Sequence, residues 1–137
     1  MRVYMISVLA GMAALAAATT AVASKPSLQS VPAVESGLLA VSVADKIRRE
    51  CRELSGRFMT ARAVLSNLYD EARAQGYSDE EIEAYVASDV QKTRMRAKRD
   101  AYLAAQGVVK SDPASYCAAG RAEMNKSSQI GALLRAR

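Results

Sequence analysis

The feature that most constrains the fold is an apolar stripe in the first half of the chain, where apolar residues recur at alternating spacings of three and four. Its members are Ala44, Ile47, Cys51, Leu54, Phe58, Ala61, Leu65, Leu68 and Ala72. This period predicts helix, with a kink or short break at Ser55-Gly56, because a glycine costs about 1 kcal/mol inside a helix. Since the phase continues past Gly56, we expect both halves to face the same core.

The second half of the chain carries its own helix signals. Ser78 with Glu81 three residues later forms a capping-box pattern, and Gly107 is a typical helix end, so one helix is expected between them. Asp112-Pro113 then predicts the cap and first position of another helix.

Ser128 can cap a last turn or two near the C-terminus. No alternation of period two is long enough to indicate a strand. The patterns together predict an all-α fold, a small bundle of three to five helices in a single domain over residues 37–137. Residues 24–36, with Pro26 and Pro32, are expected to be an extended leader.

Residues 1–23 have the layout of a cleaved signal peptide. Arg2 precedes an uncharged, mostly apolar run. Ala21-Val22-Ala23 then supplies the small-x-small pattern of a cleavage site before Ser24. An uncleaved membrane anchor is the alternative, because the run is nearly long enough to span a bilayer. Cleavage after Ala23 predicts a periplasmic or secreted protein with no transmembrane segment.

Two cysteines, Cys51 and Cys117, lie in separate helical segments of this chain. In an oxidising compartment they are expected to form one disulfide, with two buried free thiols as the alternative. Their spacing is not that of a C-x-x-C redox pair. The two cysteines are 66 residues apart, so a bond between them would close most of the domain.

Candidate functional residues are few. The chain has no histidine, which excludes histidine-based triads and histidine-ligated metals, and no nucleophile–base pair is evident. We therefore predict no catalytic residues, no metal site and no cofactor. The acidic run of residues 79–83 is best explained by helix capping, with a metal or acid–base site as the alternative.

Basic residues concentrate between positions 92 and 99, where five positive charges fall within eight residues. They indicate either a solvated helix face or a docking surface for an anionic partner. No aromatic interleaving or known motif supports nucleic-acid binding. The candidate contact residues for a protein partner are Tyr85, Arg94, Arg96, Arg99 and Tyr102.

Several short segments are familiar when read in order after the export signal: Gly76-Tyr77-Ser78-Asp79-Glu80-Glu81-Ile82, Arg94-Met95-Arg96, Asp112-Pro113 with Tyr116-Cys117, Gly120-Arg121-Ala122-Glu123, and Ile130-Gly131-Ala132-Leu133-Leu134-Arg135. The chain thereby resembles a family of small exported alphaproteobacterial proteins known only as a domain of unknown function. The resemblance implies placement outside the cytoplasm and no mechanism. Because some relatives are encoded beside genes of the respiratory NADH dehydrogenase, it also implies at most an accessory role there.

These observations predict an exported, non-catalytic helical protein that is a binding, structural or assembly partner in the bacterial envelope. One alternative is an accessory factor of the respiratory NADH dehydrogenase. Another is a periplasmic acid-stress chaperone, in which protonation of the acidic run at 79–83 would expose apolar surface. The oligomeric state and the partner stay open.

Overall fold

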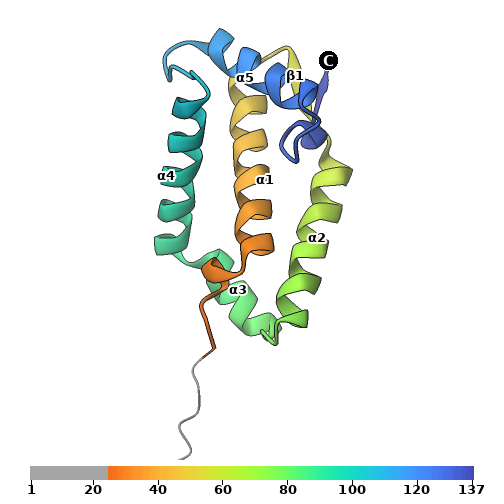
Figure 1. Cartoon of the computed structure of the whole chain (residues 1–137), viewed down its shortest axis with the longest axis vertical. Helices are drawn as coiled ribbons and strands as arrows, with labels where there is room; N and C mark the ends of the chain where they lie inside the picture. The colour runs from red at the N-terminus through yellow and green to blue at the C-terminus, as the bar shows by residue number, and fades with distance from the viewer. Residues whose placement is uncertain (1–24) are drawn as a thin grey trace, which may run out of the picture.

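The computed structural model describes residues 25–137, which form five α-helices, two short 3-10 helices and one pair of strands (Figure 1). In chain order these are η1 (Leu28–Ser30), α1 (Pro32–Glu50), β1 (Leu54–Gly56), α2 (Phe58–Ala74), α3 (Asp79–Ala87), α4 (Asp89–Ala105), α5 (Pro113–Asn125), η2 (Gly131–Leu133) and β2 (Leu134–Ala136). The predicted all-α class is confirmed. The predicted signal peptide, residues 1–23, lies outside the described residues.

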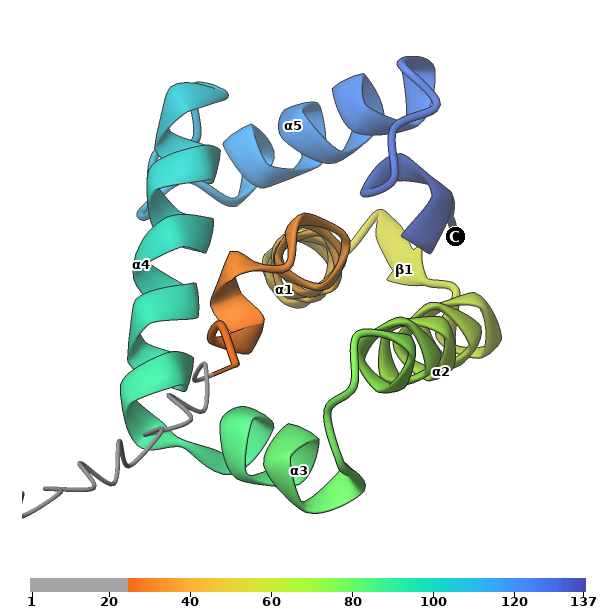
Figure 2. The same ribbon diagram turned by 60° about the horizontal axis from the view of Figure 1, so that its bottom comes forward.

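Helix α1 is the centre of the molecule. Viewed nearly along its axis, it is surrounded by α4, α5, α2 and α3 (Figure 2). Val43 and Ile47 on this helix are completely buried, in a core cluster that also contains Leu103 from α4 and Tyr116 from α5. The other helices therefore fold around α1 and bury their apolar faces against it.

The N-terminal part of the domain differs from the expected extended leader over residues 24–36. Pro32 occupies the first turn of α1, a position that suits its fixed φ and missing N–H. Before it, η1 packs Leu28 into a second cluster with Val34, Ala72 and others. The leader prediction was wrong over these residues because the prolines were read as signs of extended chain, whereas one of them begins the central helix.

The apolar stripe is divided between two antiparallel helices. The chain does break near Ser55-Gly56, as predicted, but it reverses there, and α2 runs back alongside α1 (Figure 1). Phe58 and Leu65 are consequently 64% and 40% exposed, while Ile47 and Leu54 are buried. Both halves do contribute to the core, since Ala61 packs against the cluster that contains Ile47 and Leu54, but a phase read across a chain reversal does not place every stripe residue there.

The break also contains a strand, contrary to the expectation of none. β1 pairs antiparallel with β2, with Leu54 opposite Ala136 and Gly56 opposite Leu134. Strands of three residues are too short for period-two alternation to be visible in a sequence. Their pairing joins the middle of the chain to its C-terminal end.

The segment predicted as one helix from Ser78 to Gly107 is two helices. Ser88 has extended backbone, and its side chain caps α4 by accepting a hydrogen bond from the Gln91 N–H. Ser88 and Gln91 match the capping-box spacing, a signal that indicates this boundary from the sequence. The bend brings Tyr85 at the end of α3 into contact with Arg94 on α4.

The predicted disulfide between Cys51 and Cys117 is present, with an S–S distance of 2.04 Å. It joins the C-terminal end of α1 to α5, and Cys51 has no exposed surface. Next to it in the fold, Gly131 of η2 packs so closely on the backbone of α5 that a Cβ there would overlap the carbonyl group of Glu123. The C-terminal segment is thus fixed to the core by the sheet, by close packing and by the neighbouring disulfide.

Candidate binding groove

An open groove of about 410 Å³ lies between α1 and α4 and is bordered by the end of α3. From α1 it is lined by Leu38, Val41, Asp45 and Arg49, which recur at spacings of three and four and so share one face of the helix. We call this the α1–α4 groove.

Helices α3 and α4 supply the opposite wall. Val86 and Met95 add apolar surface, and Lys92, Arg96 and Arg99 add positive charge. The groove therefore has an apolar floor and a basic wall. Such a surface fits a ligand that combines apolar groups with negative charge.

Of the five contact residues predicted from the sequence, the structure brings Tyr85, Arg94, Arg96 and Arg99 together at this groove. That they contact a partner stays a prediction. The fifth, Tyr102, lies elsewhere, with its hydroxyl 2.6 Å from a carboxylate oxygen of Glu123. Burial, together with the hydrogen bond to Glu123, raises the pKa of Tyr102 to about 12.

Glu123 itself is almost completely buried, at 1% exposed. Besides the Tyr102 hydroxyl, it accepts hydrogen bonds from Lys126 and from the Ser128 side chain. Burial alone would raise its pKa, but the hydrogen bonds from Ser128 and Tyr102 outweigh that effect and lower it. Tyr102 and Glu123 therefore join α4 to α5 and are structural.

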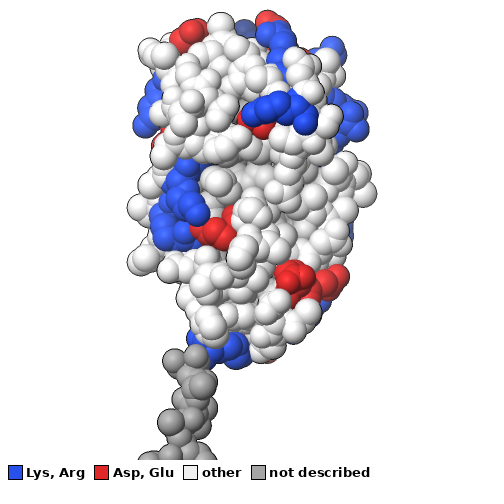
Figure 3. Space-filling model, in the orientation of Figure 1, with Lys and Arg blue, Asp and Glu red and all other residues white. Residues whose placement is uncertain are grey.

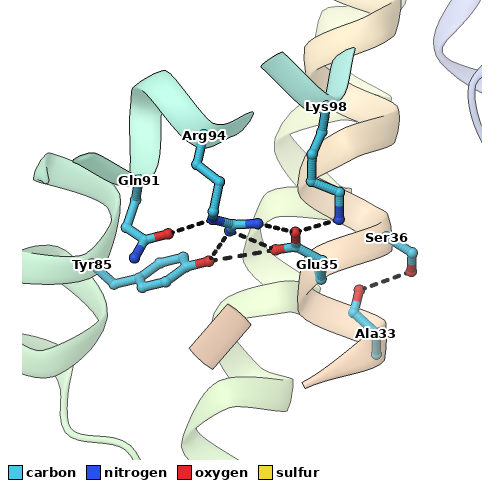
Figure 4. A network of polar contacts seen from close by, with 7 residues as sticks. All are labelled: Ala33, Glu35, Ser36, Tyr85, Gln91, Arg94 and Lys98. Atoms are coloured by element: carbon cyan, nitrogen blue, oxygen red, sulfur yellow. Dashed lines mark hydrogen bonds and ion pairs between the residues drawn. The ribbon is translucent and has the colours of Figure 1, made fainter. Parts of the chain in front are cut away.

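A network of polar contacts fastens the start of α1 to α4 at one edge of the groove (Figure 4). The Glu35 carboxylate, 12% exposed, accepts hydrogen bonds from Arg94 and from Lys98, the latter at 2.6 Å. Arg94 also donates to the Tyr85 hydroxyl at 2.8 Å and to the Gln91 side chain. The Glu35 carboxylate thus binds two cations, and one of them, Arg94, stabilises the bend between α3 and α4 through its bond to Tyr85.

The electrostatics of this network follow from its geometry. The hydrogen bond from Arg94, aided by that from Lys98, lowers the pKa of Glu35 to about 2. The same contact with Glu35 raises the pKa of Arg94. Burial raises the pKa of Tyr85, with a smaller contribution from the negative charge of Glu35. The carboxylate therefore remains ionised, and the tyrosine neutral, across the physiological range of pH.

The basic residues of α4 fall into two sets with different roles. Arg94 and Lys98 are one turn apart and bind Glu35, whereas Lys92, Arg96 and Arg99 line the groove without bonding to Glu35. Arg94 both binds Glu35 and lines the groove. On the face drawn in Figure 3, Lys and Arg atoms gather over α4 with acidic atoms beside them. The sequence run of five cations is therefore neither one stripe nor an evenly solvated surface.

Reasoning from the sequence missed Glu35 and the α1 wall of the groove. Glu35 was placed in the leader, although it stands in the first turn after a proline, where a carboxylate favours helix formation. Leu38, Val41 and Asp45 lie inside the predicted helical domain, but they are not on the apolar stripe that begins at Ala44, so the stripe did not identify them as the wall of a groove. A helix start assigned at Pro32 would have placed Glu35 in the first turn of α1.

The acidic run at 79–83 has structural partners. Asp79 accepts a hydrogen bond from Arg73 at 2.7 Å, which lowers its pKa. Glu81 completes the capping box with Ser78 and pairs with Lys25 at 2.8 Å; its pKa is lowered mainly by Lys25. These carboxylates stabilise the start of α3 and fasten the N-terminal segment to it.

No group of three or more Cys, Asp or Glu side chains within residues 25–137 is placed to hold a metal ion. Over the same range, no helix has the length and apolar character needed to cross a membrane.

Fold and groove together define a small helical protein, closed by one disulfide, with a basic groove on its central helix. Residues 26–135 match a family of unknown function, DUF5333, and the chain belongs to this family. The expected membership of a family of unknown function is thereby confirmed. No curated protein and no solved structure matches the chain.

Proposed function

We propose that the protein is a non-catalytic binding protein of the bacterial envelope that contacts a partner protein through the α1–α4 groove. The observation that carries this proposal is the groove itself, which combines an apolar floor with five basic side chains among its lining residues. A buried disulfide between distant helices supports a site of action in an oxidising compartment.

The structure lends less support to the acid-stress chaperone. That function requires the acidic run to become neutral in mild acid, but the pKa values of Asp79 and Glu81 are lowered by Arg73 and Lys25. Both carboxylates therefore keep their charge to lower pH than free side chains do. Under the alternative of an accessory role, the partner would be a subunit of the respiratory NADH dehydrogenase.

Crosslinking and affinity purification from native envelopes tests the proposal. Arg96→Glu is the informative variant, because within the described residues Arg96 bonds only to Thr93 and the change should leave the fold intact. Arg62→Glu, a charge reversal at another exposed position, on α2, is the matched control.

We expect specific partners to be recovered with the unaltered protein and with Arg62→Glu, and to be lost with Arg96→Glu. Equal recovery with all three proteins would exclude the groove as the binding surface. Recovery of NADH dehydrogenase subunits in a groove-dependent manner would identify the accessory role.

A further inference from the structure

The shape of the α1–α4 groove limits what can occupy it. Its α1 wall extends from Leu38 to Arg49, a rise of about 17 Å at 1.5 Å per residue, or about three helical turns. The groove is open to solvent, so an acyl chain lying in it would stay partly in water. A helix has a polar side that can face the solvent while its apolar side covers Leu38, Val41 and Met95.

The charge around the groove adds a second constraint. Asp45 lies between Arg48 and Arg49, at 2.6 and 2.7 Å, so one negative charge is shared by two positive ones. Asp100 is shared in the same way by Arg99 and Lys110, at 2.8 and 3.7 Å.

Glu35 is the third shared carboxylate, between Arg94 and Lys98. Each of the three trios carries a net positive charge. Arg96 adds another, since no carboxylate among residues 25–137 pairs with it. The walls of the groove carry an excess of positive charge, because one acidic side chain lines them, Asp45, against five basic ones, Arg49, Lys92, Arg94, Arg96 and Arg99.

From these two constraints, and resting on the proposed function, we propose that the groove binds an amphipathic helix of about three turns in the partner protein, with acidic residues flanking its apolar face. The apolar side chains of that helix would cover the floor between α1 and α4. Its carboxylates would meet Arg96 and Arg99 on the α4 wall and Arg49 on α1. Electrostatic complementarity of this kind sets specificity and the rate of association.

The test uses the protein purified from envelopes and a fluorescent, lactam-stapled 14-residue helical peptide with a leucine face flanked by glutamates. Stapling is needed because an isolated helix of this length is only marginally stable. The matched peptides replace every glutamate by lysine, or the leucines by serine. Vesicles containing phosphatidylglycerol test the alternative that the groove binds anionic lipid.

Fluorescence anisotropy should show saturable binding of the acidic peptide, weakening as salt concentration rises. We expect both control peptides to fail, and Arg96→Glu to weaken binding about tenfold while Arg62→Glu does not. Equal binding of the lysine peptide, no effect of Arg96→Glu, or binding to vesicles without binding to the acidic peptide would each overturn the inference.

These outcomes are separable from those of the proposed function. If the acidic peptide binds in the groove but no groove-dependent partner is recovered from envelopes, the proposed function fails and the chemistry of the site stands. If such a partner is recovered but its crosslinked segment is not an acidic amphipathic helix, the function stands and the identity of the occupant is wrong.

Discussion

At the scale of single residues, the molecule depends on a few carboxylates that are each bound by more than one donor. Glu35 connects α1 to α4, and Glu123 connects α5 to α4 through Tyr102. For neither carboxylate does the adjacent sequence indicate which distant residue it will bind. Each becomes important because the fold places it in a poorly hydrated position where an unpaired charge would be costly.

Replacing Glu35 by Gln tests this view. The change removes the charge that holds Arg94 and Lys98, and charge-assisted hydrogen bonds contribute more than neutral ones. We expect the free energy of unfolding to fall by about 2 kcal/mol, measured by urea denaturation. Glu83→Gln, at an exposed position on the neighbouring helix α3, is the control and should have little effect; a similar loss in both variants would show that Glu35 has no special role.

At the scale of elements, local signals decide where helices begin. Ser78 and Glu81 bond reciprocally at the start of α3, Ser88 caps α4, and Asp112 caps α5 by accepting from the Ala114 N–H. Gly76 and Gly107, both with positive φ, follow the ends of α2 and α4. The boundaries of these helices are therefore properties of short segments.

Replacing Ser78 by Ala removes one half of the capping box. We expect a loss of about 1 kcal/mol in the free energy of unfolding, with the largest increase in amide hydrogen exchange in the first turn of α3. Ser111→Ala is the matched control, because Ser111 is exposed and lies outside any helix. If exchange in α3 were no faster in the Ser78 variant than in the control, the capping box would contribute nothing.

At the scale of the whole molecule, the disulfide and the C-terminal strand close the fold. Cys51 and Cys117 are 66 residues apart, so their bond restricts most of the unfolded domain. β2 reinforces this closure by pairing with β1, and both lie at the same end of α1 as the disulfide (Figure 1).

We expect the double variant Cys51→Ala/Cys117→Ala to lose about 4 kcal/mol of stability, from the entropy of closing a loop of this size. Thermal unfolding followed by circular dichroism measures the change. A reductant should lower the melting temperature of the unaltered protein toward that of the variant and leave the variant unaffected. Insensitivity of the unaltered protein to complete reduction, verified by thiol titration, would contradict this expectation.

The stability of the whole domain should also depend on pH. Glu35 has a folded-state pKa of about 2 against an ordinary value of 4.5, so its stabilising contribution is complete above pH 4.5 and is lost as the pH falls toward 2. The pKa values of Asp79, Glu81 and Glu123 are also lowered and act in the same direction.

Melting temperatures measured between pH 7 and pH 2 should therefore decline below about pH 4.5. The decline should be shallower in Glu35→Gln, which lacks the main titrating group. Parallel curves for the two proteins would show that Glu35 does not contribute. A melting temperature that stays constant down to pH 2 would contradict the lowered pKa values altogether.

By itself, the sequence determined the helical class, the start of α5 at Pro113, the capping box of α3 and the pairing of the two cysteines. These features rest on local backbone preferences and on the small number of cysteines, so they can be recognised in short stretches of chain. Four of the five predicted contact residues also share one groove. Three of them, Arg94, Arg96 and Arg99, lie close together along α4.

Only the tertiary structure decided that the chain reverses after Cys51, that Leu54 to Gly56 pairs with the C-terminus, and that Tyr102 is structural. It also placed Glu35 between Arg94 and Lys98, about sixty positions further along the chain. Such contacts are set by how α1 packs against its neighbours, and no local pattern encodes them. The groove has the same origin, since its walls come from two helices that are distant in the sequence.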